Sequence, residues 1–358
     1  MATEAILLVG GMGTRLRPLT ERTPKPMLPV GGAPLVAHQL ARLADIGIRH
    51  VVLATSYRPE VFAGFLAAGG APGLEVEHVT EDEPLGTGGA IRNVADRLRG
   101  GPDDSVVVLN GDILSGHDVA AELALHESAG AAVTLYLTRV ADARAYGCVP
   151  TDRAGRVTAF LEKMPEPVTD QINAGCYVFR RSAVDAIPAG RVVSVERETF
   201  PGLVAAGDLV LGFVDDAYWL DVGTPAAFVQ GSRDLVLGRL RSSALPGPTG
   251  ELLLLPGARV HPGAAVRGGS VVGAVAVVAS GAVVEGSVLM DGAVVGAGAQ
   301  VRDSVVGVGA SIGAGAVLTA AVVGDGAHVG DRGRLLAGTR VDVDETVGDD
   351  VTRGPDGA

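Results

Sequence analysis

The sequence has almost no cysteine and no long apolar run. Cysteine occurs only twice in 358 residues, at Cys148 and Cys176, which excludes a disulfide framework and a cysteine-based metal motif. No apolar run is long enough to span a membrane. The first apolar run, residues 5–10, is too short for a signal peptide and has no basic residues before it. We therefore expect a cytoplasmic protein with no membrane partner.

Positive charge is also scarce, and lysine is almost absent. The 29 Lys and Arg residues stand against 41 Asp and Glu, a net charge of −12, which argues against nucleic acid as a general partner. Only two of the cations are lysines: Lys25 stands between two prolines, and Lys163 follows Glu162. Because the chain is acidic, an anionic ligand needs a local cluster of donors, and both lysines are candidates for it.

Up to about residue 240, short apolar runs alternate with stretches of helical periodicity. Strands are expected at residues 5–10, 50–55, 74–79, 106–112 and 131–137, and helices at residues 34–47, 87–99 and 119–130. This alternation predicts an α/β layer with a largely parallel sheet. Ligands of such folds bind beyond the carboxyl ends of the strands, so the loops after the first and fourth strands are the first places to look for a site.

From about residue 252 the periodicity changes to a hexapeptide repeat. Apolar residues recur in steps of six, or of five at three places, with mostly small residues between them. The assigned positions are Val260, Val266, Val272, Val277, Val283, Leu289, Val295, Val301, Val306, Ile312, Leu318, Val323, Val329, Leu335, Val341 and Val347. A helix cannot bury such a repeat on one face, whereas a triangular coil of short strands can. We therefore predict a left-handed parallel β-helix of about five coils, preceded by a linker at residues 242–251.

The glycine-rich loop after the first strand, GGMGTRLRPLT, allows three interpretations. A dinucleotide fingerprint needs a third glycine where Leu16 stands. A P-loop needs Gly-Lys-Ser/Thr, which Thr14-Arg15 does not supply. What remains is an open loop whose N–H groups point at phosphates, followed by the cations Arg15, Arg17 and Lys25.

This loop and the PKPMLPV segment after it resemble the signature of the sugar-1-phosphate nucleotidyltransferases, most closely that of the mannose-1-phosphate guanylyltransferases. Further matches follow in the family's order: EPLGTGG (83–89), LNGD (109–112), YGCV (146–149), EK (162–163), NAGCYVF (173–179), VERETFP (195–201) and YWLDVGTP (218–225). The hexapeptide tail is also found in that family. The resemblance therefore covers nearly the whole chain.

The resemblance implies a Rossmann-like nucleotidyltransferase domain at residues 1–241 with a mixed, mostly parallel sheet, the β-helix at residues 252–350 and a tail at 351–358. It implies attack by a sugar-phosphate oxygen on the α-phosphorus of a nucleoside triphosphate, with release of pyrophosphate. The substrate brings its own nucleophile, so catalysis reduces to alignment and charge neutralisation. Mg²⁺, which prefers one or two carboxylates, is the expected cofactor.

The resemblance also assigns the site residues. The expected catalytic residues are Arg15, Lys25 and Asp112, and the expected metal ligands are Asp112 and Asp221. The nucleotide is expected at Leu8, Gly10, Gly11, Gly13, Thr14, Arg15, Lys25, Glu83, Gly88 and Asp112. The sugar phosphate is expected at Gly147, Glu162, Lys163, Asn173 and Asp221.

The expected nucleotide is GTP, because a carboxylate can accept both N1–H and the 2-amino group of guanine. Glu83 is the candidate for this contact, and Glu81 and Asp82 could take its place. Three departures from the family pattern lie near the expected base and sugar sites: Gly89, where alanine is usual, Cys148, where an aliphatic residue is usual, and the altered EKMPEP segment after Lys163. They leave open a cyclitol phosphate or an unusual hexose as the substrate.

Two other functions compete with this one. A non-catalytic regulatory paralogue would usually lose the loop glycines, the arginine or a metal-binding aspartate, and all are present. An acyltransferase built on the β-helix would need a histidine base, and only His261 and His328 lie there, neither with an obvious carboxylate partner in sequence. We expect the β-helix to serve assembly of a homo-oligomer and to carry no chemistry.

Overall fold

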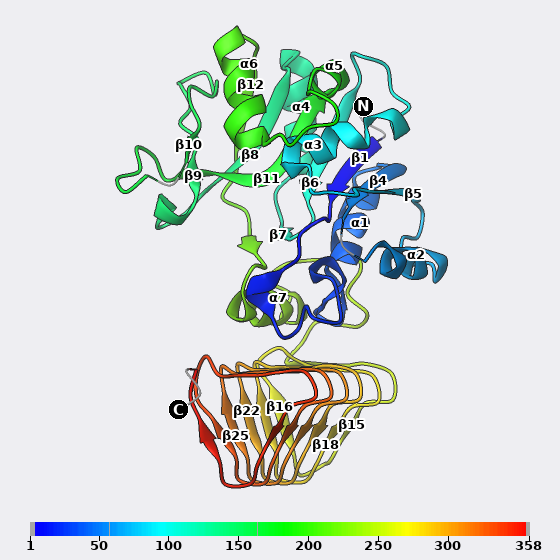
Figure 1. Ribbon diagram of the computed structural model, residues 1–358, viewed down its shortest axis with the longest axis vertical. Coiled ribbons are helices and arrows are strands. Elements are labelled where there is room, and N and C mark those ends of the chain that lie inside the picture. The colour runs from blue at the N-terminus through cyan, green and yellow to red at the C-terminus, as the bar shows by residue number, and fades with distance from the viewer. Residues whose placement is uncertain (1–3, 57, 163, 356–358) are drawn as a thin grey trace. The chain divides into compact units, whose positions relative to one another are not determined.

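Parallel strands build two different scaffolds in the computed structural model, which describes residues 4–56, 58–162 and 164–355. Contacts group the chain into two units. The sheet unit consists of Met1–Gly11 and Gln39–Trp219, and the β-helix unit of Met12–His38 and Leu220–Ala358. The boundaries expected from the sequence, at residues 241, 251 and 350, stay a prediction. Figure 1 shows the elements of each unit.

The sheet unit is built on a nine-stranded sheet with the order β10-β9-β11-β6-β1-β4-β5; off this path, β8 pairs with β11, and β12 pairs with β8. Four neighbouring strands are parallel: β1 (Glu4–Leu8), β4 (His50–Thr55), β5 (Glu75–Thr80) and β6 (Ser105–Asn110). The others are β8 (Val133–Arg139), β9 (Gly147–Cys148), β10 (Leu161–Glu162), β11 (Gln171–Arg180) and β12 (Val210–Val214). Because β11 runs antiparallel to β6 and β8, the sheet is mixed, which confirms the predicted fold class.

The three helices predicted from the sequence are present, one of them divided, and the described chain has further helices that the sequence did not predict. The helical elements are α1 (Leu35–Asp45), α2 (Pro59–Ala67), α3 (Gly86–Asn93), η3 (Ala95–Arg97), α4 (Val119–Ala129), η4 (Ala143–Ala145), α5 (Arg181–Asp185), η5 (Val195–Thr199), α6 (Phe200–Ala206) and α7 (Pro225–Val236). The helix predicted at 87–99 is split at Val94 (φ −95°, ψ −4°) into α3 and the 3₁₀ turn η3. Helix α4 begins and ends as its sequence predicts: Asp118 accepts a hydrogen bond from the Ala121 N–H, and Gly130 adopts φ 61°.

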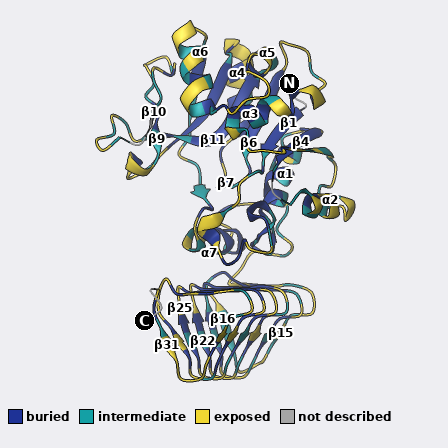
Figure 2. Ribbon diagram, viewed as in Figure 1, coloured by how far each residue is buried: buried dark blue, intermediate teal, exposed yellow. Residues whose placement is uncertain are grey.

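The core of the sheet unit lies on the central strands. Ile6, Val52 and Val108 have no exposed surface and pack in one cluster with aromatic side chains of β11 and α6. Figure 2 shows the central strands as buried, whereas α2 and α6 turn exposed residues outward. No helix of the described part of the chain is both long and apolar enough to cross a bilayer.

The β-helix consists of three parallel sheets of six strands each, which is consistent with the predicted left-handed β-helix. The first sheet contains β14 (Leu252–Leu254), β17 (Ser270–Val272), β20 (Val288–Leu289), β23 (Val305–Val306), β26 (Val322–Val323) and β29 (Arg340–Val341). The second contains β15 (Arg259–Val260), β18 (Val277–Val278), β21 (Val294–Val295), β24 (Ser311–Ile312), β27 (His328–Val329) and β30 (Thr346–Val347). The third contains β16 (Ala265–Arg267), β19 (Val283–Glu285), β22 (Gln300–Arg302), β25 (Val317–Thr319), β28 (Arg334–Leu335) and β31 (Thr352–Arg353).

The hexapeptide pattern predicts the core of this coil with two errors of position. Val278 and Val284 are buried in the core, whereas the predicted core residues Val277 and Val283 are only partly buried. Each position belongs to a pair of adjacent valines, so the sequence alone does not show which member points inward. With six strands in each sheet, the coil is also longer than the five turns expected.

The remaining short elements are η1 (Thr14–Leu16), η2 (Lys25–Met27), β2 (Pro29–Val30), β3 (Ala33–Pro34), β7 (Ile113–Ser115) and β13 (Trp219–Asp221). In the β-helix unit, the hairpin of β2 and β3 is tied to α7, because the Gly31 N–H donates to Ser232 Oγ at 3.1 Å. Helix α7 is tied to the coil in turn: Arg233 Nη1 lies 2.8 Å from Asp303 Oδ1. The loop of residues 12–38 thus folds with the β-helix rather than with the strand that precedes it.

Candidate functional site

In the sheet unit, several predicted residues follow the carboxyl ends of parallel strands. Leu8, at the end of β1, pairs with Ala54 on one side and Asn110 on the other, so Gly10, Gly11 and Asp112 emerge at one edge. Gly111 brings the loops together: its N–H donates to Leu8 O at 2.9 Å, and a Cβ there would lie 2.7 Å from the same oxygen. The edge is the one at which ligands of parallel sheets bind.

The acidic run after β5 contains one buried carboxylate. Glu81 is 9% exposed, whereas Asp82 and Glu83 are exposed. The Glu81 N–H donates to Thr55 O at 2.8 Å, and Glu81 Oε2 accepts a hydrogen bond from the Leu85 N–H at 3.4 Å. Glu81 Oε1 is buried and has no hydrogen-bond partner among the described residues. Burial raises the pKa of this carboxyl, so a ligand that donates N–H groups to it would relieve an energetic cost.

The glycines of EPLGTGG serve close packing against Val193. The Gly88 N–H donates to Val193 O at 2.8 Å, and a Cβ on Gly88 would lie 2.8 Å from Val193 Cγ1. A Cβ on Gly89 would lie 2.7 Å from Leu85 Cβ and 2.8 Å from Arg191 O. The departure at Gly89 therefore has a packing reason. The predicted contact of Gly88 with the nucleotide stays a prediction.

On the β-helix unit, two predicted cations converge on one predicted metal ligand. Lys25 Nζ lies 3.7 Å from Asp221 Oδ1, and its side chain is 7% exposed. Arg15 Nη2 lies 3.9 Å from Asp221 Oδ2, and its side chain is 68% exposed. Gly223 makes room for this approach, because a Cβ there would lie 2.6 Å from Arg15 Nη2. The buried lysine and the accessible arginine thus form one local cluster of donors.

Gly13 sets the path of the loop that carries these cations. It adopts φ 61°, ψ 32° immediately before η1, a conformation that favours glycine. A Cβ there would lie 2.9 Å from Lys25 Cβ, so Gly13 also allows the two segments to approach. Thr14 begins η1, and Thr20 Oγ1 donates to Gly13 O at 2.9 Å. The loop is therefore shaped by its own backbone contacts.

Three of the residues predicted for the sugar phosphate, Gly147, Glu162 and Asn173, lie on antiparallel strands of the sheet unit, whereas Asp221 belongs to the β-helix unit. Asn173 is held in one orientation: its Nδ2 donates to the Tyr177 hydroxyl at 2.8 Å, and its Oδ1 accepts from the Gly175 N–H at 3.1 Å. Gly147 on β9 pairs with Glu162 on β10. Lys163 lies outside the described residues. Cys148 is buried in a small apolar cluster with Ala143 and Ile172, so this departure also has a packing reason.

Asn110, which precedes Gly111 in LNGD, is a polar residue of the carboxyl-terminal edge that was not predicted from the sequence. Its Oδ1 is buried without a hydrogen-bond partner among the described residues. It ends β6 beside Leu8, at the same edge as Asp112. The signal was present, because an asparagine at the end of a buried parallel strand is a polar group that needs a partner.

One buried cluster has the composition of a metal site but not its chemistry. His117, Glu122 and Cys176 form a group of potential ligands in the described chain. Arg42 Nη2 lies 2.6 Å from His117 Nδ1, and because a guanidinium only donates, the ring proton sits on Nε2, 3.0 Å from Glu122 Oε2. Burial and the Arg42 charge hold the pKa of His117 well below its usual range. The nitrogen that would face a metal thus carries a proton, and the cluster is a hydrogen-bonded network.

Comparisons with known proteins agree with this geometry. Residues 4–236 match the family model described as Nucleotidyl transferase, and residues 249–353 match the GMPPB C-terminal domain. The mannose-1-phosphate guanylyltransferase of Mycobacterium tuberculosis is 56% identical over 290 residues, 81% of this chain and 80% of the relative. Mannose-1-phosphate guanylyltransferase 1 of Arabidopsis thaliana is 35% identical over 80% of this chain and 79% of the relative.

Among solved structures, the crystal structure of HddC from Yersinia pseudotuberculosis complexed with GMP-PN is similar, with a TM-score of 0.56 and 26% identity. The match covers 65% of this chain and 99% of that chain. These findings confirm the resemblance based on the motifs. The chain belongs to the nucleotidyl transferase family and carries a GMPPB-type C-terminal domain.

Proposed function

We propose that the protein transfers the guanylyl group of GTP to mannose 1-phosphate, giving GDP-mannose and pyrophosphate. The choice of GTP rests on the buried carboxylate of Glu81, which lies at the carboxyl-terminal edge of the parallel strands. Its Oε1 has no hydrogen-bond partner among the described residues. The choice of sugar rests on the relatives, which are named as mannose-1-phosphate guanylyltransferases. The 56% identity to the mycobacterial enzyme over most of both chains supports the same substrate here.

Guanine suits Glu81 better than the other bases do. Guanine presents N1–H and the 2-amino group side by side, so two donors can meet one carboxylate. Those hydrogen bonds favour the ionised form and offset the burial that raises its pKa. Uracil and thymine would present one donor flanked by carbonyls, and a buried mismatch costs about 1–3 kcal/mol. Glu83, our first candidate, is exposed, so its contact would compete with water; we now place Glu81 ahead of it.

The reaction needs no protein nucleophile. An oxygen of the sugar phosphate forms a bond to the α-phosphorus while the bond to the bridging oxygen of pyrophosphate breaks, so the leaving group gains negative charge. Arg15 and Lys25, which converge on Asp221, are the side chains we propose to neutralise it. The buried lysine offers a compact charge, and the exposed arginine is free to follow the leaving group into solvent.

Nucleotidyltransferases generally use a divalent metal ion, and we propose Mg²⁺, held by Asp112 and Asp221. The donor set fits, because Mg²⁺ takes one or two carboxylates together with phosphate oxygens. When bound, the ion would neutralise charge on the phosphates. Asp112 belongs to the sheet unit and Asp221 to the β-helix unit, so their sharing of one ion is part of the proposal.

For the sugar phosphate we propose Gly147, Glu162, Lys163, Asn173 and Asp221. The fixed orientation of Asn173 supports a role in positioning. Packing accounts for Gly89 and Cys148, two of the three departures that suggested a cyclitol phosphate, so we place mannose 1-phosphate first and cyclitol phosphates second. We also propose a cytoplasmic homo-oligomer. The two buried free cysteines suit a reducing compartment, and the mass in solution tests the assembly.

The test is a pyrophosphate-release assay of GTP, ATP, UTP and dTTP against mannose, glucose and galactose 1-phosphates and a cyclitol phosphate. We expect turnover with GTP and mannose 1-phosphate to exceed every other pair. Preference for a cyclitol phosphate would contradict the choice of sugar, and preference for UTP or dTTP the choice of base. Binding of GTP without turnover of any pair would favour the regulatory paralogue.

A further inference from the structure

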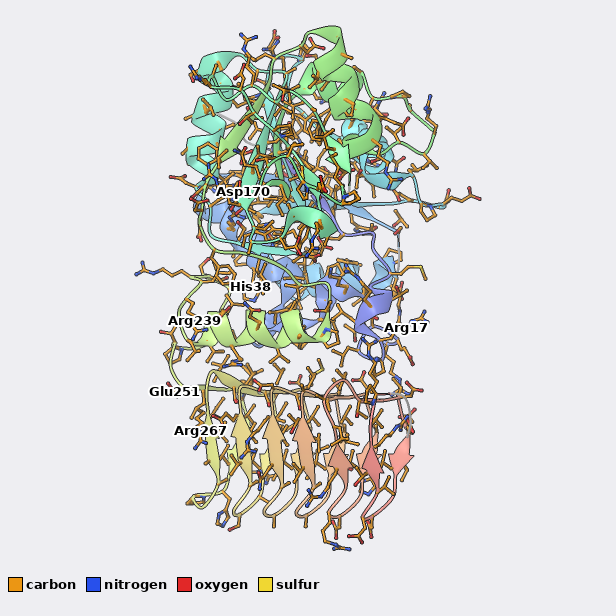
Figure 3. The ribbon with its side chains drawn as sticks, turned by 90° about the vertical axis from the view of Figure 1, so that its left-hand side faces the viewer. Arg17, His38, Asp170, Arg239, Glu251 and Arg267 are labelled. Atoms are coloured by element: carbon orange, nitrogen blue, oxygen red, sulfur yellow. The ribbon has the colours of Figure 1, made fainter. Side chains whose placement is uncertain are left out.

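One arginine of the β-helix contacts the loop that carries Arg15. Arg340, on β29, places Nη1 2.7 Å from the carbonyl oxygen of Arg17 and Nη2 3.0 Å from that of Arg15. Figure 3 labels Arg17, whose loop lies against strands from the end of the β-helix. All of these residues belong to the β-helix unit, although more than 300 positions separate them in sequence.

Both of these carbonyl groups lack a hydrogen bond from the backbone of the loop. Within η1, the N–H groups of Leu16 and Arg17 donate to Gly13 O and Thr14 O. The carbonyls of Arg15 and Arg17 receive no backbone N–H among the described residues. A guanidinium supplies two parallel hydrogen bonds in a rigid fork, so Arg340 completes the hydrogen bonding of a turn too short to hold itself.

The position of Arg340 is itself fixed by the coil. Strand β29 pairs in parallel with β26, and the neighbouring Val341 has no exposed surface in the β-helix core. A second contact lies close by in the sequence, an ion pair between Arg22 of the loop and Asp344. The loop is therefore held at two points by one turn of the β-helix.

We infer that Arg340 is a positioning residue for nucleotidyl transfer, through which the β-helix fixes the phosphate loop. The carbonyl that it binds belongs to Arg15, whose side chain approaches Asp221 where Gly223 leaves room. Release of that carbonyl would let Arg15 leave the place where charge develops on the leaving group. The inference rests on the proposed function, and it gives the β-helix a part in catalysis beyond the assembly role expected from its sequence.

The test compares Arg340→Ala and Arg340→Lys with Arg334→Ala, a matched control on the exposed surface of β28. In Arg340→Ala we expect kcat to fall roughly tenfold to a hundredfold, as for a misplaced catalytic group. The KM for mannose 1-phosphate should change less than about twofold, because no sugar contact is removed. The kcat of Arg340→Lys should stay well below that of the wild type, because an ammonium group cannot donate two parallel hydrogen bonds as a guanidinium does. Arg334→Ala should match wild type.

Hydrogen exchange of residues 12–22 provides a readout that does not depend on turnover, and we expect it to rise in Arg340→Ala but not in Arg334→Ala. Wild-type kcat in Arg340→Ala, or an equal loss in Arg334→Ala, would overturn the inference. If Arg340→Ala fails to fold, Arg340→Lys decides, and wild-type kcat in that variant is the contrary result. If the wild type turns over no substrate pair, the proposed function fails instead. In that case, unchanged hydrogen exchange of residues 12–22 in Arg340→Ala would show that Arg340 does not hold the loop.

Discussion

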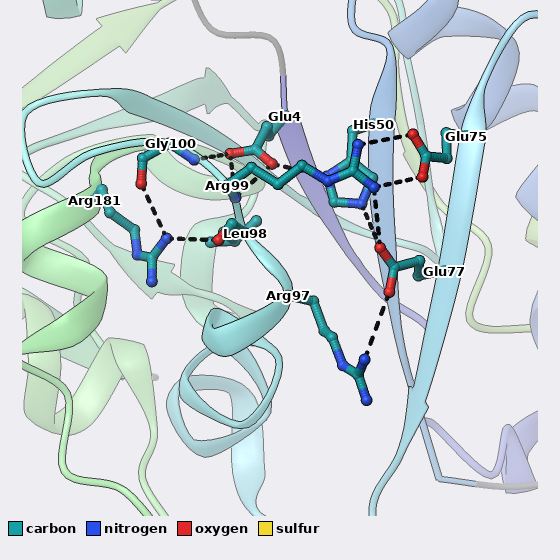
Figure 4. A network of polar contacts seen from close by, with 9 residues as sticks. All are labelled: Glu4, His50, Glu75, Glu77, Arg97, Leu98, Arg99, Gly100 and Arg181. Carbon is teal, nitrogen blue, oxygen red and sulfur yellow. Dashed lines mark hydrogen bonds and ion pairs between the residues drawn. The ribbon is translucent and has the colours of Figure 1, made fainter.

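The two edges of the parallel strands in the sheet unit differ in one physical respect. At the amino-terminal edge, both oxygens of the buried Glu4 carboxylate have hydrogen-bond partners. Glu4 accepts hydrogen bonds from the N–H groups of Arg99 and Gly100 at 2.8 and 2.7 Å, and from His50 at 2.8 Å. Figure 4 shows this network, which continues to Glu75 and Glu77. At the carboxyl-terminal edge, Glu81 Oε1 and Asn110 Oδ1 are buried without partners among the described residues.

The difference shows what each edge is for. Buried polar groups are nearly always hydrogen-bonded, because an unpaired one costs about 1–3 kcal/mol. The amino-terminal edge, which we call the closed edge, has its hydrogen bonds without a ligand and should contribute to stability alone. The carboxyl-terminal edge, which we call the open edge, has unpaired hydrogen-bond acceptors where parallel sheets bind ligands. The open edge should therefore contribute to binding and turnover. Substitutions at the two edges should therefore have opposite signatures.

The largest effect is expected at Asp112. Asp112→Asn should reduce kcat by about a thousandfold, the upper range for removing one preorganised electrostatic group, while leaving unfolding by urea unchanged. The matched control is Asp103→Asn, which changes an exposed carboxylate just before the first residue of β6. This variant should keep wild-type kcat. Near wild-type activity of Asp112→Asn at limiting Mg²⁺ would remove Asp112 from the proposed metal site.

At the closed edge, Glu4→Gln should lower the free energy of unfolding by about 2 kcal/mol, because its amide N–H₂ faces backbone donors that the carboxylate accepted. The kcat of the folded variant should equal that of the wild type. Glu75→Gln, at an exposed position of the same network, should lower the free energy of unfolding much less than Glu4→Gln, because solvent screens an exposed ion pair. Urea titrations and turnover of the three proteins check this. A loss of kcat in Glu4→Gln at full stability would break the contrast between the edges.

Much of this contrast follows from the sequence, but not all of it. The place of Asp112 was predictable, because a polar residue after a buried parallel strand emerges at the ligand edge. The choice between Glu81 and Glu83 was not, since three consecutive acidic residues look alike until the chain turns back to bury one of them. Arg340 carries no local signal at all, because its contacts are with backbone atoms at the other end of the chain. The assignment of Val277 and Val283 to the β-helix core was wrong for a related reason. A shift of one residue in the repeat decides which of two adjacent valines faces inward.

A buried oxygen without a hydrogen-bond partner does not by itself indicate a ligand site, as Glu122 shows. Its Oε1 is buried without a partner in the described chain, but it lies in the Arg42 network. Burial raises the pKa of Glu122 to about 8, above the ordinary value near 4.5 of the unfolded chain. A raised pKa means that the folded state binds the proton more tightly, so this stability is full below about pH 4.5 and is lost as pH rises to about 8.

Glu122→Gln should remove this pH dependence without loss of turnover. Between about pH 5 and pH 8 the wild type should lose at least about 1.4 kcal/mol more stability than the variant, the equivalent of one unit of pKa. Urea midpoints at several pH values measure it. Parallel profiles of the two proteins would show that Glu122 is already ionised in the folded protein.

The smallest effect tests whether the sugar phosphate has its own cation. Lys163→Ala should raise the KM for mannose 1-phosphate by about tenfold, or 1.4 kcal/mol, with little change for GTP. Lys163→Arg should restore only part of the lost affinity for mannose 1-phosphate, because the two cations differ in geometry. Equal loss of affinity for both substrates would contradict a role confined to the sugar phosphate.

The most direct test of the central claim, that the open edge binds guanine through Glu81, is the nucleotide preference of Glu81→Gln beside that of Glu83→Gln. With mannose 1-phosphate as acceptor, we expect kcat/KM for GTP to fall by about 1–3 kcal/mol, roughly tenfold to a hundredfold, in Glu81→Gln. The kcat/KM for ATP should change little, so the preference for GTP should narrow, and Glu83→Gln should keep the wild-type preference. An unchanged preference in Glu81→Gln, or a preference lost only in Glu83→Gln, would contradict this assignment.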